Sequence, residues 1–214
     1  MGRRRIRSLA FCAVAGAVLA ASSAFAQETA SGGDDRYHRH QGQFLRFDLG
    51  GGYLRSSATP NGTDASLSGA AVSFGVSLGA SVMENLSVFG HASISSAPLP
   101  NASLAGSSVG TSSSSLDFLS IGPGVNYYFM PSNFYLSAAI LMTGLVTTLE
   151  GNSGSTKVGF GATFSVGKEW WVSDRWGLGI AGQFSFGSNK DKGPGSPPTW
   201  TTITPALAFS ASFG

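Results

Sequence analysis

Four polar residues stand out in this sequence because they could act together chemically. They are Arg46, Asp48, Asn126 and Glu169, and each lies in a stretch that otherwise contains mainly small and apolar residues. A guanidinium, an amide and two carboxylates can pair into a buried polar cluster, or they can line a constriction that selects among solutes. Both hypotheses require that the surrounding elements bring these side chains together.

His91 and Ser93 form a second candidate site. They are two positions apart, so in an extended segment an imidazole and a hydroxyl share one face, as a base and a nucleophile require. The segment 86–96 holds no acidic residue that would orient the histidine. We therefore expect His91 to be an interior polar residue and not a catalytic base.

For two further motifs, the surrounding sequence argues against a functional site. Gly177-Leu-Gly179-Ile-Ala-Gly182 has the spacing of a dinucleotide-binding loop, but such a loop joins a strand to a helix, and here an apolar alternation continues to Phe186. His38-Arg39-His40 offers two imidazoles without a further ligand nearby, which is a poor metal site. We expect neither a cofactor nor a metal.

The chain begins with the three-part pattern of a cleaved export signal, residues 1–26. Four arginines between Arg3 and Arg7 precede an apolar run from Leu9 to Ala21, and Ala24-Phe25-Ala26 follows. The run is shorter than the roughly 20 residues of a spanning helix, and no later apolar stretch of that kind exists. Polar residues 27–42 are predicted to be a flexible periplasmic tail.

Removal of the signal changes the charge balance and the cysteine count. The four arginines leave with it, so the formal net charge falls from +2 to −2, and a role in binding nucleic acid loses its electrostatic support. Cys12, the one cysteine, leaves as well. A secreted chain without disulfides must be stabilised by backbone pairing and burial, which favours a closed sheet.

Apolar residues recur at every second position from Gln43 onward, which is typical of strands with two different faces. In 70–82, Val72, Phe74 and Val76 alternate with serine and glycine. We expect eight strands, an even number suited to an antiparallel barrel. They are 43–56, 65–82, 86–96, 114–129, 134–149, 156–172, 176–188 and 199–213.

The connections between these segments alternate in length. Tight turns are expected at 83–85, 130–133 and 173–175, and usually longer loops at 57–64, 97–113, 150–155 and 189–198. In outer-membrane barrels the short turns are periplasmic and the long loops extracellular. Both ends of the mature chain are then predicted to be periplasmic.

The composition of the second face distinguishes a membrane barrel from a soluble one. That face is mainly Ser, Gly, Ala and Thr, and charged residues are 11% of the chain, against about 25% in ordinary soluble domains. Small residues suit the narrow lumen of eight strands, while the Val, Leu and Phe face meets lipid. By this alternation Arg46, Asp48, His91, Asn126 and Glu169 point into the lumen.

Aromatic residues gather beside the predicted periplasmic turns, as in a membrane-interface girdle. They are Tyr127, Phe129, Phe134, Tyr135, Trp170, Trp171 and Trp176. Lys168 faces outward among them and can reach the interface. Pro123 and Pro205 fall inside strands, where we expect local bulges.

Residues 43–214 resemble the small outer-membrane β-barrel superfamily of OmpA, OmpX and OmpW type. The resemblance rests on the export signal, the eight amphipathic segments, and the stretches Ile121-Gly-Pro-Gly-Val-Asn-Tyr-Tyr-Phe129 and Gly167-Lys-Glu-Trp-Trp-Val172. It implies an all-β, eight-stranded, antiparallel up-and-down transmembrane barrel. Members usually end in an aromatic residue that the insertion machinery reads, whereas here Phe213 precedes Gly214.

We expect a non-enzymatic outer-membrane protein that serves envelope integrity or surface interaction through its loops. The alternative, which the OmpW-type resemblance implies, is a narrow passage for a small or hydrophobic molecule. A third hypothesis is a lipid-modifying enzyme. Some outer-membrane barrels deacylate lipid A with a histidine and a serine, and His91 and Ser93 are residues of these types. Expected partners are outer-membrane lipid, lipopolysaccharide and the insertion machinery; the loop ligand is not specified, and a monomer is expected.

Overall fold

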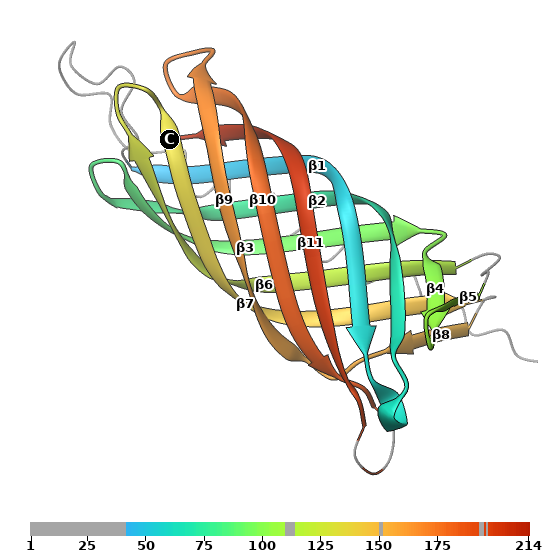
Figure 1. The fold of residues 1–214 in the computed structure, drawn as a ribbon. Helices are drawn as coiled ribbons and strands as arrows, with labels where there is room; N and C mark the ends of the chain where they lie inside the picture. Colours follow the sequence, from blue (N-terminus) through green and yellow to red (C-terminus); the bar gives the residue numbers. More distant parts are fainter. Residues whose placement is uncertain (1–41, 110–113, 150–151, 193–194, 196) are drawn as a thin grey trace, which may run out of the picture. The chain divides into compact units, whose positions relative to one another are not determined.

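The computed structural model describes residues 42–109, 114–149, 152–192, 195 and 197–214. The predicted signal peptide, His38-Arg39-His40 and all but the last residue of the predicted tail lie outside this range. One antiparallel sheet contains eleven strands, of which eight close into a barrel (Figure 1). The barrel strands are β1 (Gln43–Ala58), β2 (Ala65–Met83), β3 (Leu86–Pro98), β6 (Ser114–Phe129), β7 (Phe134–Leu149), β9 (Gly159–Trp171), β10 (Trp176–Lys190) and β11 (Thr199–Phe213).

The barrel closes where β1 pairs with both β2 and β11. Paired residues can be followed from strand to strand around the closed sheet. A path that starts from Arg46 on β1 goes through Ser77 on β2 and His91 on β3, and it comes back to β1 at Ser56. The return point is ten residues further along the strand. With usual strand spacings, this stagger corresponds to a strand tilt of about 40°.

The short connections lie together at one end of the barrel, which we call the turn end. It comprises the connections after β2, β6 and β9, the start of β1 and the end of β11. The opposite end, the loop end, carries the 3-10 turn η2 (Pro60–Gly62) and three short strands. These are β4 (Asn101–Leu104), β5 (Ser107–Val109) and β8 (Asn152–Ser155), which the sequence analysis assigned to loops.

The outer face of the barrel is an apolar belt. Ile140, Leu207 and Phe209 each expose more than 70% of their surface, although they are large and hydrophobic. On the barrel strands, the charged residues of the outer face lie close to the rims: Arg55, Asp117, Lys168 and Lys190. Apolar area of this extent on the outside is stable only in an apolar surrounding, so the fold is that of a transmembrane barrel.

Pro123 and Pro205 lie within β6 and β11, but the predicted bulges are absent there. The pairing register before and after each proline is the same, and only local ladder pairs are missing. Each proline sits on the outer face. A register shift occurs instead at Ser81–Met83 in β2, where the strand approaches its turn.

The helical content of the described residues contains nothing long and apolar enough to cross a membrane.

Candidate functional site: the polar lumen

Arg46 is the centre of a polar cluster inside the barrel. Its side chain enters from β1, is 2% exposed, and donates hydrogen bonds of 3.1 Å to Asn126 Oδ1 and to Ser137 Oγ. Its Nε lies 3.5 Å from Asp48 Oδ2, two positions along the same strand. The guanidinium also lies 4.6 Å from the ring centre of Tyr135. The structure therefore brings Arg46, Asp48 and Asn126 into one network.

Glu169 occupies a second, adjacent network. It enters from β9, is 1% exposed, and accepts hydrogen bonds from three hydroxyl groups. Tyr128 donates at 3.0 Å, Ser212 at 2.5 Å and Ser210 at 3.3 Å. A carboxylate that accepts several hydrogen bonds is well satisfied without a cation at contact distance. Glu169 thus joins β9 to β6 and β11 across the lumen.

His91 lies near Asp48, since both side chains border Gly75. Its Nδ1 is 2.9 Å from Ser77 Oγ on β2, while Ser93 is hydrogen-bonded to Ser120 at 2.6 Å. The two residues proposed as base and nucleophile therefore have separate partners. Gly75 leaves the space for this arrangement, because a Cβ there would lie 3.2 Å from His91 Cε1.

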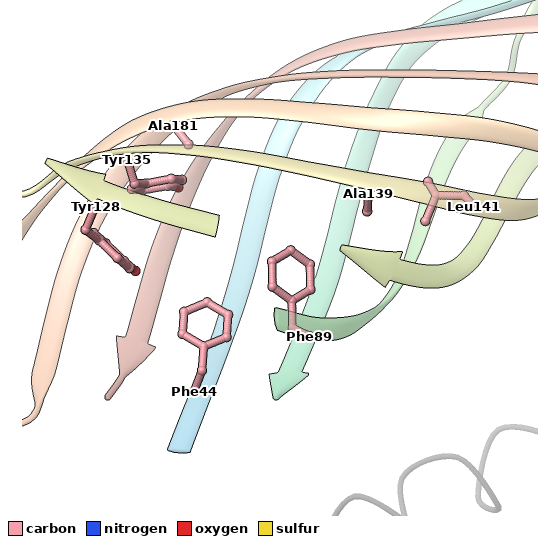
Figure 2. Close-up of a cluster of buried hydrophobic side chains, with 7 residues drawn as sticks. All are labelled: Phe44, Phe89, Tyr128, Tyr135, Ala139, Leu141 and Ala181. Atoms are coloured by element: carbon pink, nitrogen blue, oxygen red, sulfur yellow. The ribbon is translucent and has the colours of Figure 1, made fainter. Parts of the chain in front are cut away.

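An aromatic cluster fills the lumen at the turn end. Figure 2 shows Phe44 and Phe89 side by side, with Tyr128 and Tyr135 beside them. The ring centres of Phe44 and Phe89 are 5.5 Å apart, and those of Tyr128 and Tyr135 are also 5.5 Å apart. This cluster corrects the sequence analysis, which placed Tyr135 in the outer girdle; Tyr135 is fully buried inside.

Glycines on the inner face provide the room for these large side chains. A Cβ at Gly124 would lie 2.5 Å from the ring of Phe89, and a Cβ at Gly167 would lie 2.6 Å from that of Tyr135. Gly179 leaves room for Glu169 in the same way, because a Cβ at Gly179 would lie 2.6 Å from Glu169 Cγ. The glycine motif 177–182 is thus part of strand β10, and two of its glycines pack beside Glu169 and its partners.

A second apolar cluster fills the lumen near the loop end. It is formed by Leu54, Ala71, Ala97, Leu116, Phe118 and Leu145, with Leu67 and Trp200 packed against it. Between the two clusters lies a small polar cavity of about 20 Å³, bordered by Asp48, His91 and Ser93 among others. That volume holds about one water molecule. Buried side chains therefore occupy the lumen on the turn-end side and on the loop-end side of this cavity.

The girdle at the turn end is formed by the outward-facing aromatic residues. Tyr127, Phe129, Phe134, Trp170 and Trp176 are exposed there. Trp171 alternates to the inner side and is only partly exposed, so it does not belong to the girdle. Lys168 faces outward as predicted, with its ammonium 4.8 Å from the ring centre of Phe134 and 5.8 Å from that of Trp170.

The loop end continues the sheet beyond the barrel. β4 pairs with β2 and β5 pairs with β4, while β8 pairs with β7. Ala105 donates a hydrogen bond to the carbonyl of Asp64, and Lys192 Nζ donates to Ser155 Oγ at 2.7 Å. In the described part of this end the connections are held to one another. Among the described residues, no group of three or more His, Cys, Asp or Glu side chains is arranged to hold a metal.

Comparisons with known proteins give matches of structure and none of sequence. No protein-family model and no curated protein sequence matches the chain. Neisserial surface protein A is similar in structure, with a TM-score of 0.56 and 14% identity over 80% of this chain and 96% of that one. OprG from Pseudomonas aeruginosa has a TM-score of 0.45 and 13% identity, covering 84% and 99% of the two chains. The outer membrane protein AlkL has a TM-score of 0.43 and 13% identity, covering 87% of this chain and 95% of that one.

The closed barrel and the likeness to Neisserial surface protein A confirm the predicted architecture. This chain has the all-β, eight-stranded antiparallel fold of the small outer-membrane barrels.

Proposed function

We propose that this protein is an integral barrel of the bacterial outer membrane with a closed lumen, whose loop end presents a surface for interaction outside the cell. In this orientation the turn end and both ends of the mature chain are periplasmic, and residues 1–26 are the cleaved export signal. The alternation of short turns with longer loops supports this orientation.

The filled lumen is the observation that carries the closed-barrel proposal. A passage for solutes needs a continuous path, whereas two apolar clusters occupy the lumen on either side of a cavity of about 20 Å³. The charges beside the turn-end cluster bond to protein groups: Arg46 to Asn126 and Ser137, and Glu169 to three hydroxyls. These charges therefore serve barrel stability in preference to solute selection.

The same geometry argues against a lipid-modifying enzyme. His91 and Ser93 lie on the inner face, while acyl chains would meet the opposite face. The Nδ1 of His91 is engaged by Ser77, and Ser93 is engaged by Ser120. A base that activates a nucleophile must be within hydrogen-bond reach of it.

The loop end has the properties of a preformed binding surface. The β4–β5 hairpin and β8 are exposed and rich in serine and asparagine, and Leu99 and Leu104 expose 64% and 50% of their surface. Because backbone pairing already orders these segments, a partner would bind them without a large loss of conformational entropy. Neutral hydroxyl and amide groups beside exposed leucines suit a polar, uncharged partner with an apolar portion.

Channel recording tests the closed lumen. The wild-type protein, refolded so that it shows a heat-sensitive shift on a gel, is expected to give no steady conductance in a planar bilayer. The double variant Phe44→Ala, Phe89→Ala removes the two phenylalanines of the turn-end cluster and is expected to conduct more than the wild type. Conductance by the wild type that changes in Arg46→Met or Glu169→Gln would overturn the closed barrel and support a passage.

Cysteine labelling tests the orientation, since the mature chain would carry no cysteine of its own. Ser107→Cys in the loop-end hairpin is expected to react with a membrane-impermeant maleimide on intact cells. Asp174→Cys, which is exposed at the turn end, is expected to react only after the outer membrane is permeabilised. The reverse pattern would refute the proposed orientation.

A further inference from the structure

The apolar belt is interrupted by a trough in its outer surface. The trough runs around the barrel from β1 over β11, β10, β9 and β7 to β6 and Leu86 of β3. Its whole course has a volume of about 980 Å³, and its lining is almost entirely apolar. Glycine and alanine form its floor, at Gly51, Ala138 and Gly182. Larger side chains form its walls, and in the section across β7, β9 and β10 these include Leu136, Phe164, Val166 and Phe184.

The floor glycines are not required by packing, in contrast to those of the lumen. A Cβ at Gly51 would meet no atom within 4 Å, and a Cβ at Gly182 would meet only the carbonyl oxygen of Val166, at 4.0 Å. The absence of side chains at these positions therefore keeps the trough open and relieves no clash. A ligand that fills the space would meet backbone and small side chains on its inner side.

Lys168 lies at the rim of this section of the trough. Leu136 pairs with Val166 inside it, and the next outward-facing pair toward the turn end is Phe134 with Lys168. The ammonium is held over the rings of Phe134 and Trp170. Among charged residues on the outer face of the barrel strands, Lys168 is the one near the turn end.

We propose that the trough across β7, β9 and β10 binds a phospholipid of the periplasmic leaflet, with an acyl chain on Gly182 and Ala138 and the phosphate at Lys168. The proposal rests on the membrane location given under Proposed function. Charge complementarity selects this occupant over a second copy of the chain. A girdle lysine lies at the level of anionic phosphates, and among the described residues the Lys168 ammonium contacts aromatic rings and pairs with no acidic side chain.

Two substitutions remove the two halves of the site without disturbing the barrel. Gly182→Leu fills the trough from its floor, where open space receives the side chain. Lys168→Met keeps the packing on the aromatic rings but removes the charge. Gly144→Leu is the matched control, because Gly144 also faces outward with nothing within 4 Å of its Cβ position but does not line the trough.

The experiment measures the phospholipid that stays bound after the refolded proteins are extracted from vesicles of phosphatidylethanolamine and phosphatidylglycerol into mild detergent. Native mass spectrometry gives the number of lipids per protein. The wild type and Gly144→Leu are expected to retain phospholipid equally, and Lys168→Met and Gly182→Leu to retain roughly fivefold less. Heat-modifiability on a gel, run on every sample, reports folding separately from lipid binding.

Two results would overturn the proposal. Equal retention in all four proteins would show that the trough holds no specific lipid. A dimer that disappears in Gly182→Leu but persists in Lys168→Met would assign the trough to a second copy. Failure of the wild type to fold in bilayers would instead refute the membrane location itself.

Discussion

Replacing Arg46 with methionine tests whether the luminal charges act as one network. The substitution keeps an unbranched apolar side chain but removes the donors to Asn126 and Ser137 and the cation beside Asp48. Asp48 is 4% exposed, so its carboxylate would be left buried without an opposite charge. Removing one partner of a buried pair costs about 3–5 kcal/mol. We expect that loss of unfolding free energy for Arg46→Met.

Adding a second substitution, Asp48→Asn, tests whether this loss of unfolding free energy comes from the unpaired carboxylate of Asp48. Because the double variant no longer buries a lone carboxylate, we expect it to regain about 1–3 kcal/mol relative to the sum of the single changes. Urea unfolding in detergent micelles, followed by tryptophan fluorescence, gives the free energies. Arg55→Met, an exposed arginine on the same strand, is the control and should change stability by at most about 0.5 kcal/mol. A strictly additive double variant would refute the network.

Two further predictions concern packing and hydrogen bonding in the lumen. Gly167→Ala places a Cβ 2.6 Å from Tyr135 and 2.7 Å from the carbonyl of Ile180, so it should destabilise the barrel by about 1–3 kcal/mol, whereas Gly51→Ala, with open space, should be nearly neutral in the same urea titration. Glu169→Leu removes the acceptor of three hydroxyl donors and should cost at least about 2 kcal/mol, while Glu169→Gln should cost less; equal costs would contradict a role as acceptor.

The period-two pattern was sufficient to predict the barrel because lipid and lumen impose opposite demands on neighbouring residues. Val72, Phe74 and Val76 face outward in β2 as the pattern requires, and the limits of β6, β7 and β11 agree with their predicted ranges. The hairpin of β4 and β5 was missed for the complementary reason. Its exposed residues lack an apolar alternation, so only its backbone pairing identifies it.

The interior was harder to predict because composition describes a face only on average. The inner face was described as mainly Ser, Gly, Ala and Thr in a narrow lumen, yet Phe44, Phe89 and Tyr135 project into it. The signal for Tyr135 was present, since Phe134 and Leu136 on either side face outward and alternation turns Tyr135 inward. The rings of Phe89 and Tyr135 each pack against a glycine on the neighbouring strand. Which glycine faces which ring depends on strand register, and a single sequence does not specify that register.

The luminal charges are best understood through the strands that they connect. Backbone pairing joins each strand only to its neighbours, whereas Arg46 on β1 bonds to Asn126 on β6 and Ser137 on β7, far around the barrel. A slip of one residue in β1 would turn Arg46 from these partners into lipid, at a high cost in free energy. The network therefore penalises wrong registers that apolar packing alone would tolerate. This accounts for charged residues that are buried inside the barrel and bonded to one another.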